Sequence, residues 1–183
     1  MRELLTPRDT VRIAVKVGLV VLLLGLAPPG LTQPATGLLI APGAGIGPIT
    51  LGQPISLIIG VLGAPRFTYN PGNGFTVYAW FDNTQSGPGH QAGRGLAAIA
   101  DSTTLVVEVQ AYYDPRYQTS DGLRVGLTPA QVRAKLGEPS RVMSESDGYT
   151  LVYRLRGIAF HVATNPQADG YQTVVWITVV RKG

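Results

Sequence analysis

The chain contains 183 residues, 45% of them hydrophobic, and this length suits one compact two-lobed domain. Its formal net charge is +4, but four basic and two acidic residues fall within the first 35 positions, and no basic run with interleaved aromatic residues occurs. We therefore expect no nucleic-acid partner. The absence of cysteine excludes disulfides, thiol catalysis and cysteine-ligated zinc.

Residues 1–35 have the form of a secretory signal peptide. A basic start leads into an 11-residue apolar run at residues 17–27, which Pro28, Pro29 and Gly30 follow. A membrane-spanning helix needs about 20 apolar residues, so we expect a periplasmic or secreted protein with cleavage near Ala35. Membrane contact is expected only through an uncleaved signal, and no cysteine follows the run that could carry a lipid.

Residues 36–48 are small, apolar and rich in glycine, and they predict a flexible or docked N-terminal arm. The glycines at 43, 45 and 47 superficially resemble a dinucleotide-binding loop. Such a loop needs a strand before it, a helix directly after it and a carboxylate about 20 residues later, and this context is missing. No cofactor is expected.

The clearest local element is a short helix within residues 123–139. Thr128 is placed to cap its N-terminus, and Gln131 completes a capping box. Pro129 suits the first helical position, and Gly137 suits the residue that ends the helix. A helix of two turns is marginal alone, so it must pack against a partner surface.

An earlier stretch, residues 49–65, repeats this element at a constant offset of 74, so that Leu62 matches Leu136 and Gly63 matches Gly137. Its helix, residues 54–62, is apolar on nearly every side and is predicted to be buried all round. The sequence thus predicts a first repeat over residues 49–113, a connector over residues 114–122 and a second repeat over residues 123–183.

Three strands are predicted after each helix. They cover residues 75–82, 95–100 and 105–113 in the first repeat, and residues 149–156, 158–163 and 172–181 in the second. The predicted fold class is α+β, with two tandem repeats of a short helix followed by a three-stranded antiparallel sheet, and with the helices on one face.

Alternation within the strands predicts which side chains point away from the helices. In residues 75–82 it directs Phe75, Val77, Ala79 and Phe81 toward the helix, and it places Tyr112 on the same face as Trp176. The outward face would gather a partner-binding set made of Tyr78, Trp80, Arg154, Arg156, His161 and Trp176. Tyr, Trp and Arg dominate binding hot spots. The alternative is that a few exposed aromatics are ordinary, or that this face packs on the other repeat.

Residues 83–94 have no counterpart in the second repeat and are rich in glycine. They predict either a tolerated mobile insertion or a protruding contact loop with His90 and Arg94 at its tip.

No catalytic or metal-binding motif emerges. The two histidines, His90 and His161, lie far apart without a ligand spacing, and no nucleophile elbow occurs. The remaining carboxylates are expected to serve turns and caps rather than acid and base chemistry, and they are Asp114, Asp121, Glu138, Glu145 and Asp147. We expect a noncatalytic protein without a metal or cofactor.

The segment VGLTPAQVRAKLGEPSRV at residues 125–142, followed by YTLVYRLRGIAFHV at residues 149–162, resembles two families. These are the BamE/SmpA-OmlA outer-membrane assembly lipoproteins and the β-lactamase inhibitor protein. The resemblance implies a noncatalytic envelope or secreted protein that contacts other proteins. The lipobox cysteine of the assembly lipoproteins is absent here.

The leading functional hypothesis is a secreted or envelope protein-binding module that contacts its partner through the exposed sheet face. Two alternatives stay open. One is a secreted enzyme inhibitor that uses the loop at residues 83–94, and the other is a structural envelope component or small-ligand carrier.

Overall fold

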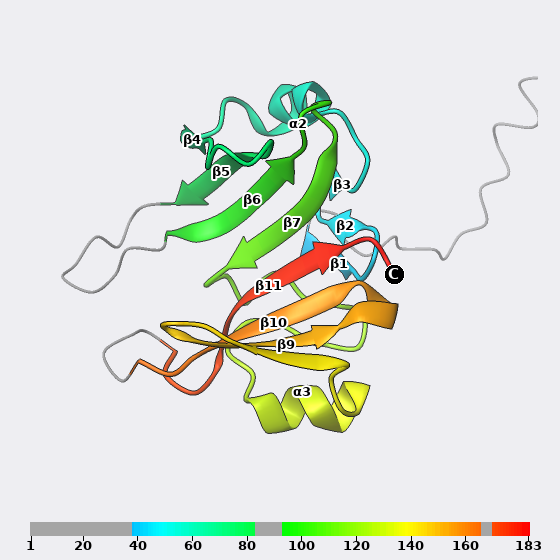
Figure 1. Cartoon of the computed structure of the whole chain (residues 1–183), viewed down its shortest axis with the longest axis vertical. Helices are drawn as coiled ribbons and strands as arrows, with labels where there is room; N and C mark the ends of the chain where they lie inside the picture. The colour runs from blue at the N-terminus through cyan, green and yellow to red at the C-terminus, as the bar shows by residue number, and fades with distance from the viewer. Residues whose placement is uncertain (1–37, 83–92, 166–169) are drawn as a thin grey trace, which may run out of the picture. The chain divides into compact units, whose positions relative to one another are not determined.

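An eight-stranded antiparallel sheet organises the computed structural model, which describes residues 38–82, 93–165 and 170–183 (Figure 1). The strand order is β4-β5-β6-β7-β11-β10-β9-β8, and a second sheet has the order β1-β2-β3. The elements are β1 (Ile40–Ala41), β2 (Gly45–Ile46), β3 (Ile49–Thr50), α2 (Ile55–Leu62), β4 (Phe67–Tyr69), β5 (Thr76–Asp82), β6 (Arg94–Ala100), β7 (Val106–Tyr112), α3 (Pro129–Leu136), β8 (Arg141–Ser144), β9 (Gly148–Tyr153), the 3-10 turn η2 (Arg154–Arg156), β10 (Ile158–Ala163) and β11 (Val174–Val180).

The predicted fold class, two tandem repeats of a helix and a three-stranded sheet, is wrong. The protein is mostly β, with 44% strand and two α-helices in the described residues. Four strands follow each helix, and β7 pairs with β11 through five registered residue pairs, which joins all eight strands into one sheet. The sequence missed β4 and β8 because these edge strands are three and four residues long and exposed throughout, without alternating burial.

The helix α3 forms as predicted. Thr128 and Gln131 make both hydrogen bonds of the capping box, Pro129 occupies the first turn, and Gly137 ends the helix. The helix α2 starts 74 residues earlier and ends at Gly63, but no side chain caps it. The prediction that α2 is buried on all sides is wrong, because Leu57 and Val61 are 57% and 68% exposed.

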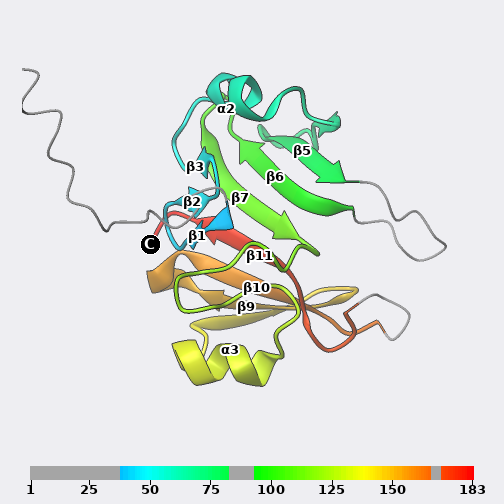
Figure 2. The same ribbon diagram turned by 180° about the vertical axis from the view of Figure 1, so that it is seen from behind.

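The hydrophobic core covers one face of the large sheet, the helix side. Both α2 and α3 supply residues to it. The small sheet lies in the same region, where β2 contacts β7 and β11 and β3 contacts β7 (Figures 1 and 2). The sheet contributes a registered row in which each residue is at most 3% exposed, made of Leu96, Ala111, Ile177, Phe160 and Leu151. The segment expected to be a flexible or docked arm is docked over its described part, because Ile40 and Ile46 are buried in this core.

The strand β5 has the opposite facing from the one predicted. Trp80 pairs with the core residue Leu96, and its indole Nε1–H donates to the Gly63 carbonyl oxygen at the end of α2, at 2.9 Å. In the other half, the Tyr153 hydroxyl donates to the matching Gly137 oxygen at 3.0 Å. Trp80 therefore corresponds to Tyr153, which lies 73 rather than 74 positions later. A one-residue shift turns every side chain of a strand to the other face.

Candidate functional site

The face of the large sheet opposite the helix side carries a continuous line of rings. We call this face the open face and the five rings the aromatic row, which consists of Phe67, Phe81, Tyr112, Trp176 and His161. Directly paired residues point to the same face, and the pairing runs across six neighbouring strands. In strand order from β5 to β9, the paired residues are Phe81, Gly95, Tyr112, Trp176, His161 and Thr150.

The rings contact one another in favourable geometries. The centroids of Phe67 and Phe81 are 5.5 Å apart with an edge-on arrangement, and those of Phe81 and Tyr112 are 5.1 Å apart. Trp176 lies 5.4 Å from Tyr112 and stacks on His161 with parallel planes 3.5 Å apart by centroid. Aromatic pairs within 4.5–7 Å each contribute about 0.5–1.5 kcal/mol beyond buried area.

Gly95 allows two of these rings to meet. It stands between Phe81 and Tyr112 in the pairing and has no side chain to separate them. Its backbone has φ of 152°, and a Cβ atom there would lie 2.2 Å from the Trp80 carbonyl oxygen. Only glycine fits this position without a shift of the backbone.

The aromatic row is partly open to solvent. Phe67 is 47% exposed, and Phe81, Tyr112 and Trp176 are half-buried. A polar strip runs beside it along β7, where the Tyr112 hydroxyl donates to Gln110 and the Gln110 amide donates to Glu108. Burial raises the pKa of Glu108, against the opposing effect of the Gln110 hydrogen bond. Burial, and then the charge of Glu108, raises the pKa of Tyr112.

His161 ends the aromatic row in a buried setting, with a fully covered side chain. Its Nδ1 lies 3.0 Å from the Thr150 hydroxyl oxygen, and Thr150 donates to Glu145 Oε1 at 2.5 Å. Asp147 Oδ1 lies 3.6 Å from Nε2, and Nε2 has no hydrogen-bond partner among the described residues. Burial lowers the pKa of His161, while Glu145 and Asp147 act in the opposite direction.

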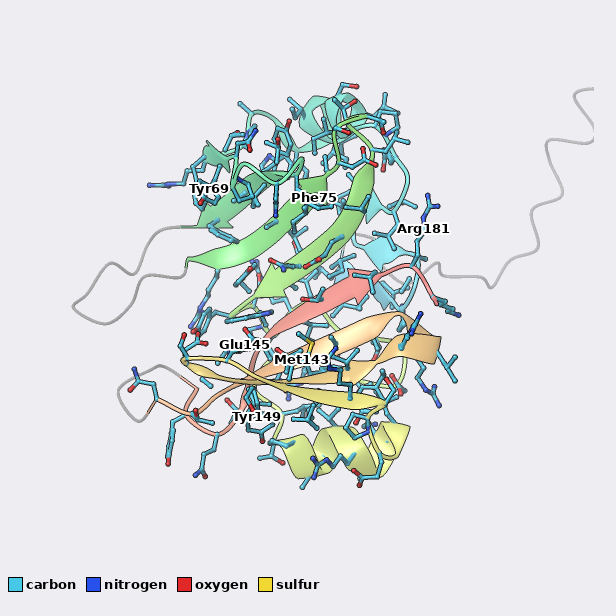
Figure 3. All side chains as sticks on the ribbon, in the orientation of Figure 1. Tyr69, Phe75, Met143, Glu145, Tyr149 and Arg181 are labelled. Carbon is cyan, nitrogen blue, oxygen red and sulfur yellow. The ribbon has the colours of Figure 1, made fainter. Side chains whose placement is uncertain are left out.

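The turn between β8 and β9 brings the two carboxylates to His161. Glu145 directly follows β8 (Figure 3), and its backbone N–H donates to the Gly148 oxygen. The Asp147 oxygen accepts from the Thr164 N–H, which ties the turn to the end of β10. One ligand atom from each of Glu145, Asp147 and His161 lies within 4.8 Å of the others. The expectation that Glu145 and Asp147 serve turns and caps stays a prediction, and their side chains in addition approach the ring of His161, each at 3.6 Å.

The predicted binding residues fall into three places. His161 and Trp176 lie on the open face and stack on each other. Tyr78 and Trp80 pack against the core of the helix side, so their assignment to the same face as His161 is wrong. Arg154 and Arg156 are exposed in η2, the turn after β9, rather than within a strand.

Of the two predicted loop residues, the structure describes Arg94 but not His90. Arg94 begins β6 and is exposed. His90 and most of the loop at residues 83–94 lie outside the described residues, as does the predicted signal peptide at residues 1–35. In the described ranges, no helix is long and apolar enough to cross a membrane.

The sequence predictions miss two of the five rings of the aromatic row. Phe67 belongs to a strand that was not predicted, and Phe81 was assigned to the helix side. Tyr112 was placed correctly on the face of Trp176, with which it is directly paired. The alternation of inward and outward side chains in β7 and β11 was therefore the sequence signal that could locate the open face, and the structure has this alternation in both strands.

A groove of about 700 Å³ also opens beside the start of α3, on the helix side. It is mostly apolar, and its lining residues are Thr128, Pro129, Ala130, Arg133, Tyr149, Val162, Thr164 and Gln172. The capping box already uses the polar groups at this helix end, because Thr128 and Gln131 bond to each other's backbone.

No family model and no curated protein matches the chain. Among solved structures, it is similar to a DUF4309 family protein, YjgB, from Bacillus subtilis subsp. subtilis str. 168, at 18% identity and a TM-score of 0.48, over 75% of this chain and 84% of that one. It is also similar to a cysteine-rich secretory protein from Staphylococcus aureus subsp. aureus Mu50, at 16% identity and a TM-score of 0.47, over 82% of this chain and 49% of that one. At these values the likenesses assign no function. The resemblance to the BamE/SmpA-OmlA lipoproteins and the β-lactamase inhibitor protein stays a prediction, since neither occurs among these proteins.

Proposed function

We propose that the chain is a noncatalytic protein-binding module of the envelope or the secreted fraction, and that the open face contacts the partner. The observation that carries the proposal is the aromatic row, a line of contacting rings on the face that the helices leave uncovered. Large aromatic side chains held rigid by their neighbours lose little conformational entropy on binding and dominate hot spots.

The corrected face differs from the predicted one in its chemistry. Phe67, Phe81 and Tyr112 replace Tyr78 and Trp80 as contact residues, and the arginines of η2 do not belong to it. Glu108 lies on this face, and Glu145 lies at the end of the aromatic row. This pattern favours a partner segment that combines apolar side chains with basic or hydrogen-bond-donating groups.

The inhibitor alternative keeps one supporting observation. The loop at residues 83–94 connects β5 to β6, and the registered pair at its base, Asp82 with Arg94, is next to Phe81 of the aromatic row. The target would then be an enzyme, and the open face would remain the main contact. The groove beside α3 is the feature that fits a small-ligand carrier.

The test is capture of the partner in the source organism. The full chain with a C-terminal affinity tag is expressed there, and bound proteins are identified by mass spectrometry in the envelope and culture fractions. The double variant Phe81→Ala with Tyr112→Ala is expected to lose the partner, since each hot-spot truncation costs about 2 kcal/mol or more.

Leu155→Ala is the matched control, because Leu155 is a large apolar residue that is 79% exposed in η2, away from the aromatic row. It should retain the partner. If the double variant is folded, as judged by circular dichroism, and still captures the partner, then the open face is not the contact surface.

A further inference from the structure

The hydrogen bonds around Thr150 assign the protons of the buried histidine. Thr150 has one hydroxyl hydrogen, and Glu145 Oε1 accepts it at 2.5 Å. The Thr150 oxygen is then free to accept, and the His161 Nδ1–H donates to it at 3.0 Å. The neutral imidazole in this arrangement carries its lone pair on Nε2.

The lone pair on Nε2 faces the carboxylate of Asp147, and neither of these two groups has a hydrogen to donate. Nε2 is buried and without a hydrogen-bond partner in the described residues, and Asp147 Oδ1 lies 3.6 Å from it. A buried polar atom without a partner is costly, and a carboxylate beside a lone pair adds repulsion. A cation between Nε2 and Asp147 satisfies both atoms at once.

The spacing suits a metal ion. Zinc binds histidine nitrogen and carboxylate oxygen at about 2.1 Å, which places two tetrahedral ligands roughly 3.4 Å apart. The observed separation of Nε2 and Asp147 Oδ1 is 3.6 Å. Glu145 has a possible ligand atom within 4.8 Å of those of the other two residues, and its Oε1 lies 3.6 Å from Nδ1. Both carboxylates are open to solvent, at 38% and 57% exposure, so an ion has a path of entry.

The surroundings hold the imidazole as a metal site requires. A ligating histidine usually donates its other ring N–H to an acceptor, and Thr150 is that acceptor here. Trp176 fixes the plane of the ring by stacking. Gly148 keeps the space beside Nε2 open, because a Cβ atom there would stand 3.1 Å from Nε2 and 2.0 Å from the Val162 oxygen.

We propose that His161, Asp147 and Glu145 bind one divalent transition-metal ion, with Zn²⁺ as the best match, and that the ion ties the β8–β9 turn to β10. One nitrogen and two carboxylate donors suit zinc-like ions better than Ca²⁺ or Mg²⁺, which take all-oxygen sites. Two exposed carboxylates alone would not make a site, but the buried Nε2, which has no hydrogen-bond partner among the described residues, lies 3.6 Å from Asp147 Oδ1. The proposal does not depend on the protein-binding function.

The site can be tested by titrating the purified, chelator-treated full chain with Zn²⁺, followed by calorimetry and by tryptophan fluorescence. The chain has two tryptophans, so Trp80→Phe leaves Trp176 as the reporter that stacks on His161. We expect binding of one Zn²⁺ per chain with a change in Trp176 emission, and no change with equal Mg²⁺ or Ca²⁺.

Variants decide whether the named residues hold the ion. His161→Gln and the exposed Asp147→Asn should weaken Zn²⁺ binding by about tenfold or more, and Thr150→Val by about 10–100-fold. Glu138→Gln is the matched carboxylate control and should bind as the unchanged chain does, since Glu138 is exposed and pairs with Arg133.

Three results would each overturn the proposal. The first is no stoichiometric Zn²⁺ binding. The second is binding that Asp147→Asn leaves unchanged while His90→Gln removes it. The third is a Trp176 signal that responds to protons but not to the metal, which would mean that a proton rather than an ion lies between His161 and Asp147.

Discussion

At the scale of single residues, one buried charged group, Asp114, is satisfied by a single partner, Arg116. Asp114 lies two residues after the end of β7 and is 1% exposed. Arg116 donates to both of its carboxylate oxygens, from Nε at 2.9 Å and from Nη2 at 2.7 Å, and the Arg116 backbone N–H adds a third bond at 3.0 Å. The sequence had assigned Asp114 to turn hydrogen bonding, and the backbone bond confirms that role.

This arrangement predicts a pH dependence of stability. Burial alone would raise the pKa of Asp114, but the Arg116 hydrogen bonds and the charges of Arg116 and Arg94 together hold that pKa below its ordinary value. The group therefore stabilises the fold above the pKa of the unfolded chain, and this contribution is lost as the pH falls through the folded pKa. Stability should drop on acidification below about pH 4.

The measurement is the urea midpoint as a function of pH for the unchanged chain and for Asp114→Asn. The variant should be less stable at pH 7 and should lose less stability between pH 5 and acid. Leu155→Ala, at an exposed residue of η2 that carries no titratable group, serves as the control and should leave the pH profile unchanged. A profile that Asp114→Asn does not flatten would contradict the assignment.

At the scale of elements, two glycines show how the same residue type serves different purposes. Gly95 in β6 has positive φ, and a Cβ atom there would collide with the Trp80 oxygen of β5. Gly60 lies inside α2, and a Cβ atom there would meet nothing within 4 Å. The first glycine is required by the pairing of two strands, and the second only lowers the stability of its helix.

The two substitutions should therefore differ in sign. Gly95→Ala should destabilise the fold by about 1–3 kcal/mol, because the β-carbon forces β5 and β6 apart or strains the backbone. Gly60→Ala should stabilise it by about 0.5–1 kcal/mol, because alanine is the better helix former. Both free energies of unfolding come from urea titrations. Equal effects of the two changes would show that the β5–β6 approach is looser than described.

The individual helices and strands also show which features of the fold could be predicted from the sequence and which could not. The capping box of α3 was predictable because Thr128, Pro129 and Gln131 lie within four residues of one another. The faces of β7 and β11 followed from alternation alone. The face of β5 could not be predicted in this way, because it depends on whether Trp80 or Ala79 is the counterpart of Tyr153. The structure identifies Trp80 as the counterpart, since Trp80 donates to the Gly63 oxygen as Tyr153 donates to the Gly137 oxygen.

The cluster around His161 was beyond the sequence for a related reason. Glu145 and Asp147 lie 16 and 14 positions from His161, a spacing without meaning in a helix or within one strand. They meet it only because β9 pairs with β10 in the register Thr150 to His161 and because the turn before β9 folds back. Register is a property of the whole sheet, so local patterns carry too little information to fix it.

At the scale of the whole molecule, the seam between β7 and β11 turns two four-stranded halves into one sheet over one core. Core residues from both halves touch across this seam, with Ala111 paired to Ile177 and Val109 to Val179. Neither half keeps its core covered without the other. The described part of the chain should consequently unfold as one unit.

The two tryptophans can test this, because Trp80 lies in the first half and Trp176 in the second. In each of the variants Trp80→Phe and Trp176→Phe, the remaining tryptophan reports on its own half. Its fluorescence transition in urea should overlay the far-ultraviolet circular dichroism transition of the same variant. A tryptophan that changes at lower urea than the backbone signal would show that its half unfolds independently.

In the part of the chain that the structure describes, the large sheet ends in two edge strands, β4 and β8, and each of them pairs with another strand on one side only. Both ends are short, at three and four residues, and Arg66 precedes β4 while Arg141 begins β8. Short strands with nearby positive charge are poor templates for addition of another chain. The same brevity that hid β4 and β8 from sequence patterns thus protects the protein against edge-to-edge polymerisation.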